Sequence, residues 1–116
     1  MKFLRGILVD EKQFKEFVRE VFVKEFLEGL DDGEFSLKDF EKWLKVGIVD
    51  FLKEEKVDEL VVFTESDVYE VWDGNSFVDV LKKVYKVGRV EDILGRVESR
   101  SRGNLSKKLS EKFWKK

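Results

Sequence analysis

Hydrophobic residues in the first third of the chain recur at three- and four-residue intervals, which is the spacing of an amphipathic helix. The stretch follows Asp10 and Gln13, whose spacing is that of a capping box, so we predict that a helix begins at Glu11. The turn-rich residues 29–33 end it. Its apolar stripe consists of Phe14, Phe17, Val18, Val21, Phe22 and Leu27.

A second helix is predicted by the same kind of start signal. Ser36 is followed three residues later by Asp39, and the charged residues 53–56 end the apolar periodicity. Two helices joined by a short turn form an N-terminal helical hairpin. The second stripe consists of Leu37, Phe40, Trp43, Leu44, Ile48, Phe51 and Leu52.

The middle of the chain has the pattern of a β-hairpin. Residues 60–64 are rich in β-branched and aromatic types, and residues 68–72 alternate between two faces. Ser76 and Asp79 then predict a third helix start, leading into a helix over Phe77 to Val87 with Gly88 as its left-handed C-terminal residue. Near the N-terminus, the apolar run from residue 3 to 9 fits a short strand or a first helical turn equally well.

Two further helices are predicted after Gly88, over residues 89–97 and roughly 102–114. The predicted fold class is therefore α+β: an N-terminal helical hairpin, a β-hairpin, then a three-helix C-terminal segment. The length of 116 residues suits a single domain. Within it we expect an acidic scaffold at 1–73 and a basic three-helix segment at 74–116.

Composition restricts the chemistry. The chain has no Cys and no His, which excludes disulfides, thiolate metal sites and the most common general base. Charged residues make up 41% of the chain, a trend of hyperthermophile proteins, although a biased genome gives the same composition. No apolar run is long enough to cross a bilayer or to form a signal peptide, so we expect a cytoplasmic protein without membrane association.

Charge is distributed unevenly along the chain. From Gly88 onward, nine Lys and Arg stand against four Asp and Glu, a net of +5, whereas the preceding residues carry a net of −7. Such asymmetry indicates a surface for nucleic acid or for an acidic partner. It is equally compatible with docking of the basic segment on the acidic body of its own chain or of a second copy.

The C-terminal third resembles the three-helix core of helix-turn-helix DNA-binding proteins. Its most specific stretch is Ile93-Leu94-Gly95-Arg96-Val97, followed by the polar run from Ser99 and then Leu105 and Leu109. The resemblance implies a supporting helix, a turn and a recognition helix, and a dimer that matches paired half-sites. The residues we expect to contact DNA are Arg100, Arg102, Asn104, Lys107, Lys108 and Lys112.

The leading hypothesis is thus a small DNA-binding protein, a regulator that acts as a homodimer. The alternative is a module for protein–protein interaction or homo-oligomerisation without nucleic acid. In that case an amphipathic C-terminal helix docks a protein partner through Leu105, Leu109, Phe113 and Trp114.

Catalysis is not expected. The only acidic cluster consists of Glu65, Asp67, Glu70 and Asp73. In a strand, Glu70 has the opposite parity to the other three, so the four carboxylates would not converge on one metal ion. We therefore predict no enzyme activity, no catalytic or metal-binding residue and no cofactor.

Overall fold

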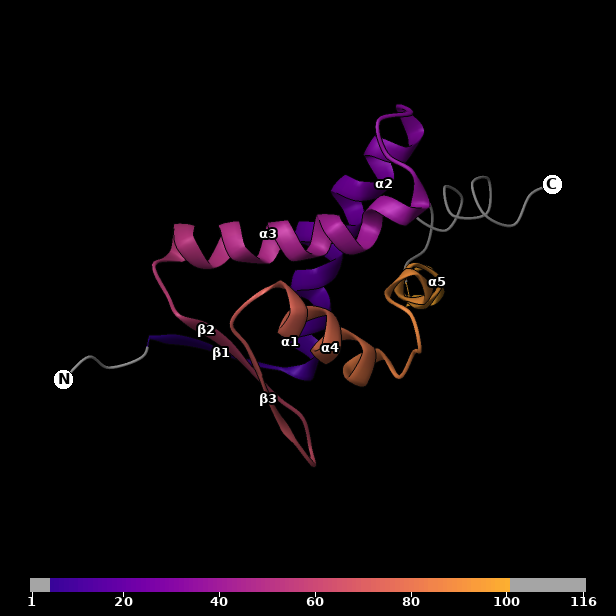
Figure 1. Cartoon of the computed structure of the whole chain (residues 1–116). Coiled ribbons are helices and arrows are strands. Elements are labelled where there is room, and N and C mark those ends of the chain that lie inside the picture. The colour runs from indigo at the N-terminus through magenta and orange to yellow at the C-terminus, as the bar shows by residue number, and fades with distance from the viewer. Residues whose placement is uncertain (1–4, 101–116) are drawn as a thin grey trace.

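A three-stranded sheet with helices on one of its faces organises the part of the chain that the structure describes (Figure 1). The structure is a computed structural model that describes residues 5–100. Three segments, η1 to η3, are a π-helix and two 3-10 helices. The elements follow in the order β1 (Gly6–Asp10), α1 (Glu11–Phe17), η1 (Val18–Val23), α2 (Lys24–Asp31), η2 (Leu37–Asp39), α3 (Phe40–Glu55), β2 (Glu59–Phe63), β3 (Val68–Val71), α4 (Gly74–Tyr85), η3 (Val90–Asp92) and α5 (Ile93–Arg100).

The sheet is mixed, with β2 in the centre. β1 pairs with β2 in parallel, and β2 pairs with β3 in antiparallel orientation. Parallel neighbours need a long crossover, and here the whole helical hairpin from α1 to α3 supplies it. α1 contacts β1 and β2, and α4 contacts β3 and α3, so the helices lie against one face of the sheet.

The helical run from α1 to α2 contains the π-helix η1. Its buried residues Phe14, Val18, Phe22, Phe26 and Leu30 lie four positions apart. An α-helix turns about 100° per residue, so each four-residue step would rotate the apolar stripe by about 40°. The wider turns of the π-helix remove much of this drift. The stripe therefore faces the core along the whole run.

Phenylalanine rings join the helical layers in the core. Phe77 of α4 packs edge-on against Phe14, with 6.1 Å between ring centroids, and lies 5.1 Å from Phe22. Phe26 and Phe40 connect α2 to α3 with centroids 4.8 Å apart. These residues are almost inaccessible to solvent. Burial of such large side chains stabilises the hairpin on the sheet.

The predicted fold class is wrong in the order of its elements. Residues 6–10 form a strand that precedes the helices, and this strand extends the expected β-hairpin into a three-stranded sheet. Periodicity could not show this, because the partner of β1 lies more than 50 residues further along the chain. The expected turn after residue 97 is also absent, since the backbone stays helical to Arg100. The predicted last helix, 102–114, lies outside the described residues.

Two of the three predicted capping boxes are confirmed and the third is wrong. The capping boxes of Asp10 with Gln13 and of Ser36 with Asp39 are confirmed. The third box is wrong by three residues, because Asp73 caps α4 and Ser76 is the residue that bonds back to it. The left-handed residue after α4 is Lys86, with φ of 57°, and not Gly88.

Candidate interaction surfaces

All but one of the residues predicted to contact DNA lie outside the described part of the chain. Only the backbone of Arg100 is described, in the last turn of α5. Arg102, Asn104, Lys107, Lys108 and Lys112 lie outside the described residues, as do the proposed docking residues Leu105, Leu109, Phe113 and Trp114. The described residues therefore do not test the predicted DNA-contact site.

The first surface is the face of the sheet opposite the helices, which we call the open face. Alternation along the strands sends every second side chain there. Leu8 is 69% exposed, Val68 67%, Trp72 59% and Phe63 41%. Val61 lies beside Leu8 in the strand register and is half-buried. Among the described residues no element covers this face, so its exposed apolar side chains make it a candidate interaction surface.

The open face also carries a pair of carboxyl groups. Glu59 on β2 and Glu70 on β3 have the same parity as Val61 and Val68. Burial of the Glu59 carboxyl raises its pKa, and a hydrogen bond to Glu70 and the charge of Glu70 raise the pKa further. The Glu59 carboxyl therefore keeps its proton to a higher pH than an isolated glutamate does.

The second surface is a groove between η1 and α3, which we call the helical groove. It encloses about 620 Å³ and its floor contains Phe22, Trp43, Gly47 and Phe51. The indole Nε1 of Trp43 donates a hydrogen bond of 3.0 Å to the carbonyl oxygen of Phe22, within the π-helix. Val21 and Val46, 40% and 53% exposed, flank the groove.

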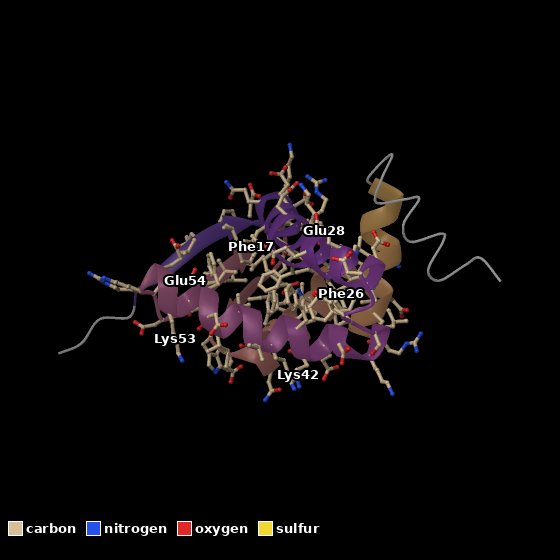
Figure 2. The ribbon with its side chains drawn as sticks, turned by 90° about the horizontal axis from the view of Figure 1, so that it is seen from above. Phe17, Phe26, Glu28, Lys42, Lys53 and Glu54 are labelled. Atoms are coloured by element: carbon tan, nitrogen blue, oxygen red, sulfur yellow. The ribbon has the colours of Figure 1, made fainter. Side chains whose placement is uncertain are left out.

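The rim of the helical groove is acidic. Glu25, Asp39, Asp50 and Glu54 line it, against Lys42 alone. Asp39 is engaged in the cap of η2, where hydrogen bonds from the Ser36 backbone and side chain lower its pKa. Within residues 5–100, the other three carboxylates form no ion pair. Figure 2 looks down on this side, with Lys42 and Glu54 extending outward from α3 and Phe17 and Phe26 between the helical layers.

A third hollow, of about 900 Å³, lies where β1 and β2 end. Ligands of open α/β sheets often bind beyond the carboxyl ends of parallel strands. Here, however, the four lysines are matched by four acidic residues. The lining charges are Lys12, Lys15, Lys83 and Lys86 against Asp10, Glu11, Glu65 and Asp67.

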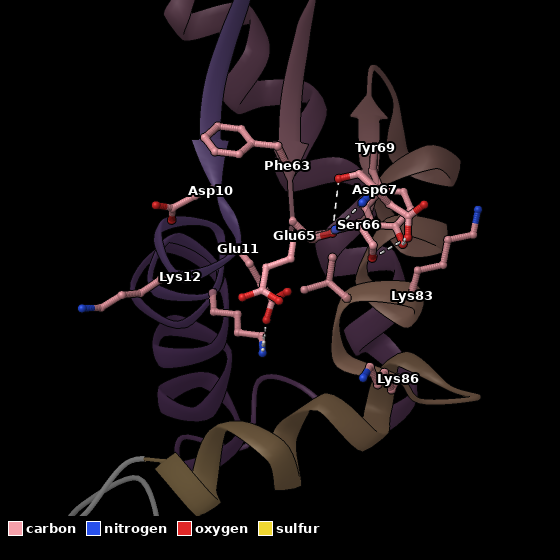
Figure 3. A pocket seen from close by; sticks show the side chains of 13 residues that line it. Asp10, Glu11, Lys12, Phe63, Glu65, Ser66, Asp67, Tyr69, Lys83 and Lys86 are labelled. Carbon is pink, nitrogen blue, oxygen red and sulfur yellow. Dashed lines mark hydrogen bonds and ion pairs between the residues drawn. The ribbon is translucent and has the colours of Figure 1, made fainter.

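Most of these carboxylates already have structural roles. Asp10 caps α1, Glu11 forms an ion pair of 3.2 Å with Lys15, and Asp67 accepts hydrogen bonds from Ser66 and Tyr69. Burial raises the pKa of the Tyr69 hydroxyl, and the Asp67 charge adds to that increase. Figure 3 shows Lys12 and Lys83 pointing away from each other at the two sides of the hollow. The arrangement places no activated nucleophile beside a base.

The acidic residues considered for catalysis are dispersed. Asp67 bonds Tyr69, Glu70 faces Glu59 on the open face, and Asp73 caps α4. Among residues 5–100, no group of three acidic side chains is placed to hold a metal ion. Over the same residues, no helix is both long enough and apolar enough to cross a membrane.

Sequence reasoning missed both apolar surfaces. Alternation in residues 68–72 was visible, but both parities contain large apolar residues, so the exposed face could not be identified. The signal for the helical groove was Val46 next to Gly47 on α3, where a glycine permits close approach of η1. Comparisons with family models, with curated proteins and with solved structures found no match for this chain.

Proposed function

We propose that this protein is a self-association module in which two copies pack the open faces of their sheets together. The observation that supports the proposal is the concentration of exposed apolar side chains. Seven large hydrophobic residues are exposed among the described residues, and four of them, Leu8, Phe63, Val68 and Trp72, lie on or at the end of this face.

The open face suits a second copy because the end that carries Phe63 and Val68 is apolar. Phe63 and Val68 pair at one end of the sheet. The adjacent row consists of Leu8, Val61 and Glu70, and Glu59 lies at the other end. Glu59 is four residues from Phe63 on the same strand, or about 13 Å. A two-fold axis near the Phe63 end brings the apolar rows together and keeps the two Glu59 side chains apart.

The size of the surface sets the expected affinity. Three strands of five residues or fewer cover about 14 by 17 Å. A standard interface buries about 800 Å² on each partner, several times this footprint. We therefore expect a dimer that forms at micromolar concentration.

Sedimentation velocity at increasing protein concentration tests the proposal. We expect wild type to shift from monomer to dimer mass and the double variant Leu8→Lys, Val68→Lys to remain monomeric. Both replaced side chains are exposed, so folding should be retained. Leu37→Lys, at an exposed position on η2, is the matched control and should associate like wild type.

A monomer mass for wild type at several hundred micromolar would contradict the proposal. A second measurement uses the absence of native cysteine. A Leu8→Cys variant should form a disulfide-linked dimer on mild oxidation, since the two-fold axis brings the Leu8 rows together, and Leu37→Cys should not.

DNA binding by the basic C-terminal residues is a second candidate, favoured by the charge asymmetry of the chain. Residues 101–116 carry six basic residues and one acidic residue, a net of +5. If Lys107 and Lys108 meet phosphates, each replacement should reduce the slope of log affinity against log salt by about 0.9. Fluorescence anisotropy of wild type and of Lys107→Ala, Lys108→Ala on duplex DNA across a salt series measures this. Equal weak binding by both proteins would reject DNA binding.

A further inference from the structure

The helical groove combines an apolar floor with unbalanced negative charge. Trp43, Phe51 and the flanking Val46 are accessible from the groove, while Glu25, Asp50 and Glu54 on its rim have no ion-pair partner within residues 5–100. Unpaired carboxylates at an exposed rim are solvated by water, so their lack of a partner costs little free energy. Together with exposed apolar side chains, however, they match a ligand that is apolar along one side and cationic along its edges.

The chain itself contains such a ligand in residues 101–116. Leu105, Leu109 and Phe113 recur at intervals of four, Trp114 adjoins them, and the basic residues stand between. The net charge of this segment is +5, and that of residues 5–100, with 16 basic and 24 acidic residues, is −8. Charge and apolar spacing are thus complementary between segment and groove.

Length and position agree with docking in the same chain. Residues 105–113 in helical form would extend about 14 Å, which fits within the roughly 24 Å of α3 along the groove, and residues 101–104 would remain as the connection from α5. Figures 1 and 2 both place α5 at the end of the molecule where α3 begins. Asp39, the residue before α3, lines this end of the groove. η3, immediately before α5, contacts α3.

We propose that residues 101–116 bind in the helical groove of their own chain, with Leu105, Leu109 and Phe113 on its floor and the lysines against its acidic rim. Tethering favours the same chain over a second copy, because a short connection gives an effective concentration of about a millimolar. The basic residues considered for DNA contact are then held on the acidic body. The helical groove is a different surface from the open face, so docking there does not depend on self-association.

Paramagnetic relaxation in the full-length chain tests the proposal. The native chain contains no cysteine, so a spin label can be attached to a single introduced cysteine in Ser110→Cys. This label should broaden the amide signals of Val21, Val46 and Gly47. The signals of Leu8 and Val68 on the open face should remain sharp. Broadening at Leu8 and Val68 instead, or at neither set, would overturn the proposal.

Neighbouring residues on α3 provide a matched pair of variants. Glu54 lines the groove and Glu55, also exposed, does not. Glu54→Lys should reduce the docked population. The equilibrium constant for docking should fall roughly two- to five-fold, as expected for the loss of one surface ion pair. Glu55→Lys should leave it unchanged. Equal behaviour of the two variants would count against the groove as the docking site.

The choice between the same chain and a second copy has its own measurement. Isotope-labelled protein without a spin label is mixed with unlabelled protein that carries it. Docking within one chain predicts no broadening at Val46 and Gly47 in this mixture. Broadening there would show that the segment binds a second copy and would overturn the proposal.

Discussion

Gly47 determines how closely α3 approaches the π-helix. A Cβ atom added at Gly47 would lie 2.5 Å from Cε1 of Phe22, whose ring is buried and also packs against Phe77. The ring cannot move away as the end of a flexible side chain would. The contact therefore joins the floor of the helical groove directly to the core.

Gly47→Ala should destabilise the protein by about 1–3 kcal/mol, because the added methyl group overpacks the Phe22 ring. Urea denaturation followed by circular dichroism measures the free energy of unfolding. Gly88→Ala is the control, since nothing lies within 4 Å of its added Cβ and its φ is not positive. A loss of stability for Gly88→Ala as large as that for Gly47→Ala would contradict this explanation.

At the scale of the element, Asp73 determines where α4 begins. Its carboxylate accepts a 2.8 Å hydrogen bond from the Ser76 backbone N–H, and the Ser76 hydroxyl accepts one of 3.0 Å from the Asp73 backbone N–H. The hydrogen bonds from Ser76 hold the Asp73 pKa below its ordinary value. The folded state thus favours the ionised form of Asp73.

A lowered pKa in the folded state gives a defined dependence of stability on pH. The contribution of the Asp73 charge is present above the unfolded pKa and is lost as pH falls through the folded pKa. Asp73→Asn retains a capping oxygen but no charge, so its melting temperature should be lower than that of wild type at neutral pH. The two values should converge in acid. A difference that stays constant with pH would show that Asp73 does not act through its charge.

Sequence signals succeeded where they were local. Asp10 and Gln13, or Ser36 and Asp39, bond to groups within one turn, so their spacing alone predicts the helix start. At α4 both Asp73 with Ser76 and Ser76 with Asp79 satisfy the pattern, and only packing chooses between them. The strand β1 and the open face depend on pairing between distant residues, which no short-range periodicity contains.

At the scale of the whole molecule, the proposed self-association should depend on pH through the carboxyl pair on the open face. The raised pKa of Glu59 means that stabilisation by its proton is fully present below the unfolded pKa and is lost as pH rises through the folded value. Packing a second copy over this face would remove further water from Glu59 and Glu70. If two copies pack as proposed, the protonated form should therefore dimerise more readily.

We expect the dimer dissociation constant to fall as pH is lowered from neutral towards the ordinary pKa of a glutamate carboxyl. In Glu70→Gln, which removes the neighbouring charge, the dimer should be tighter at neutral pH and less sensitive to pH. Sedimentation equilibrium across this range measures both effects. An association that weakens on acidification would contradict a role for the open face.

The parallel pairing of β1 with β2 also bears on how the chain folds. β2 and β3 are joined by a short turn and can pair early, whereas the Arg5 amide and its Asp58 partner are 53 residues apart in sequence. Contacts so distant in sequence form late, after the helices between them have collapsed. Until β1 docks, the valine-rich β2 has an unpaired edge, and such edges template pairing between chains. Folding yield at high protein concentration should therefore depend on how quickly the helical hairpin brings β1 to its place.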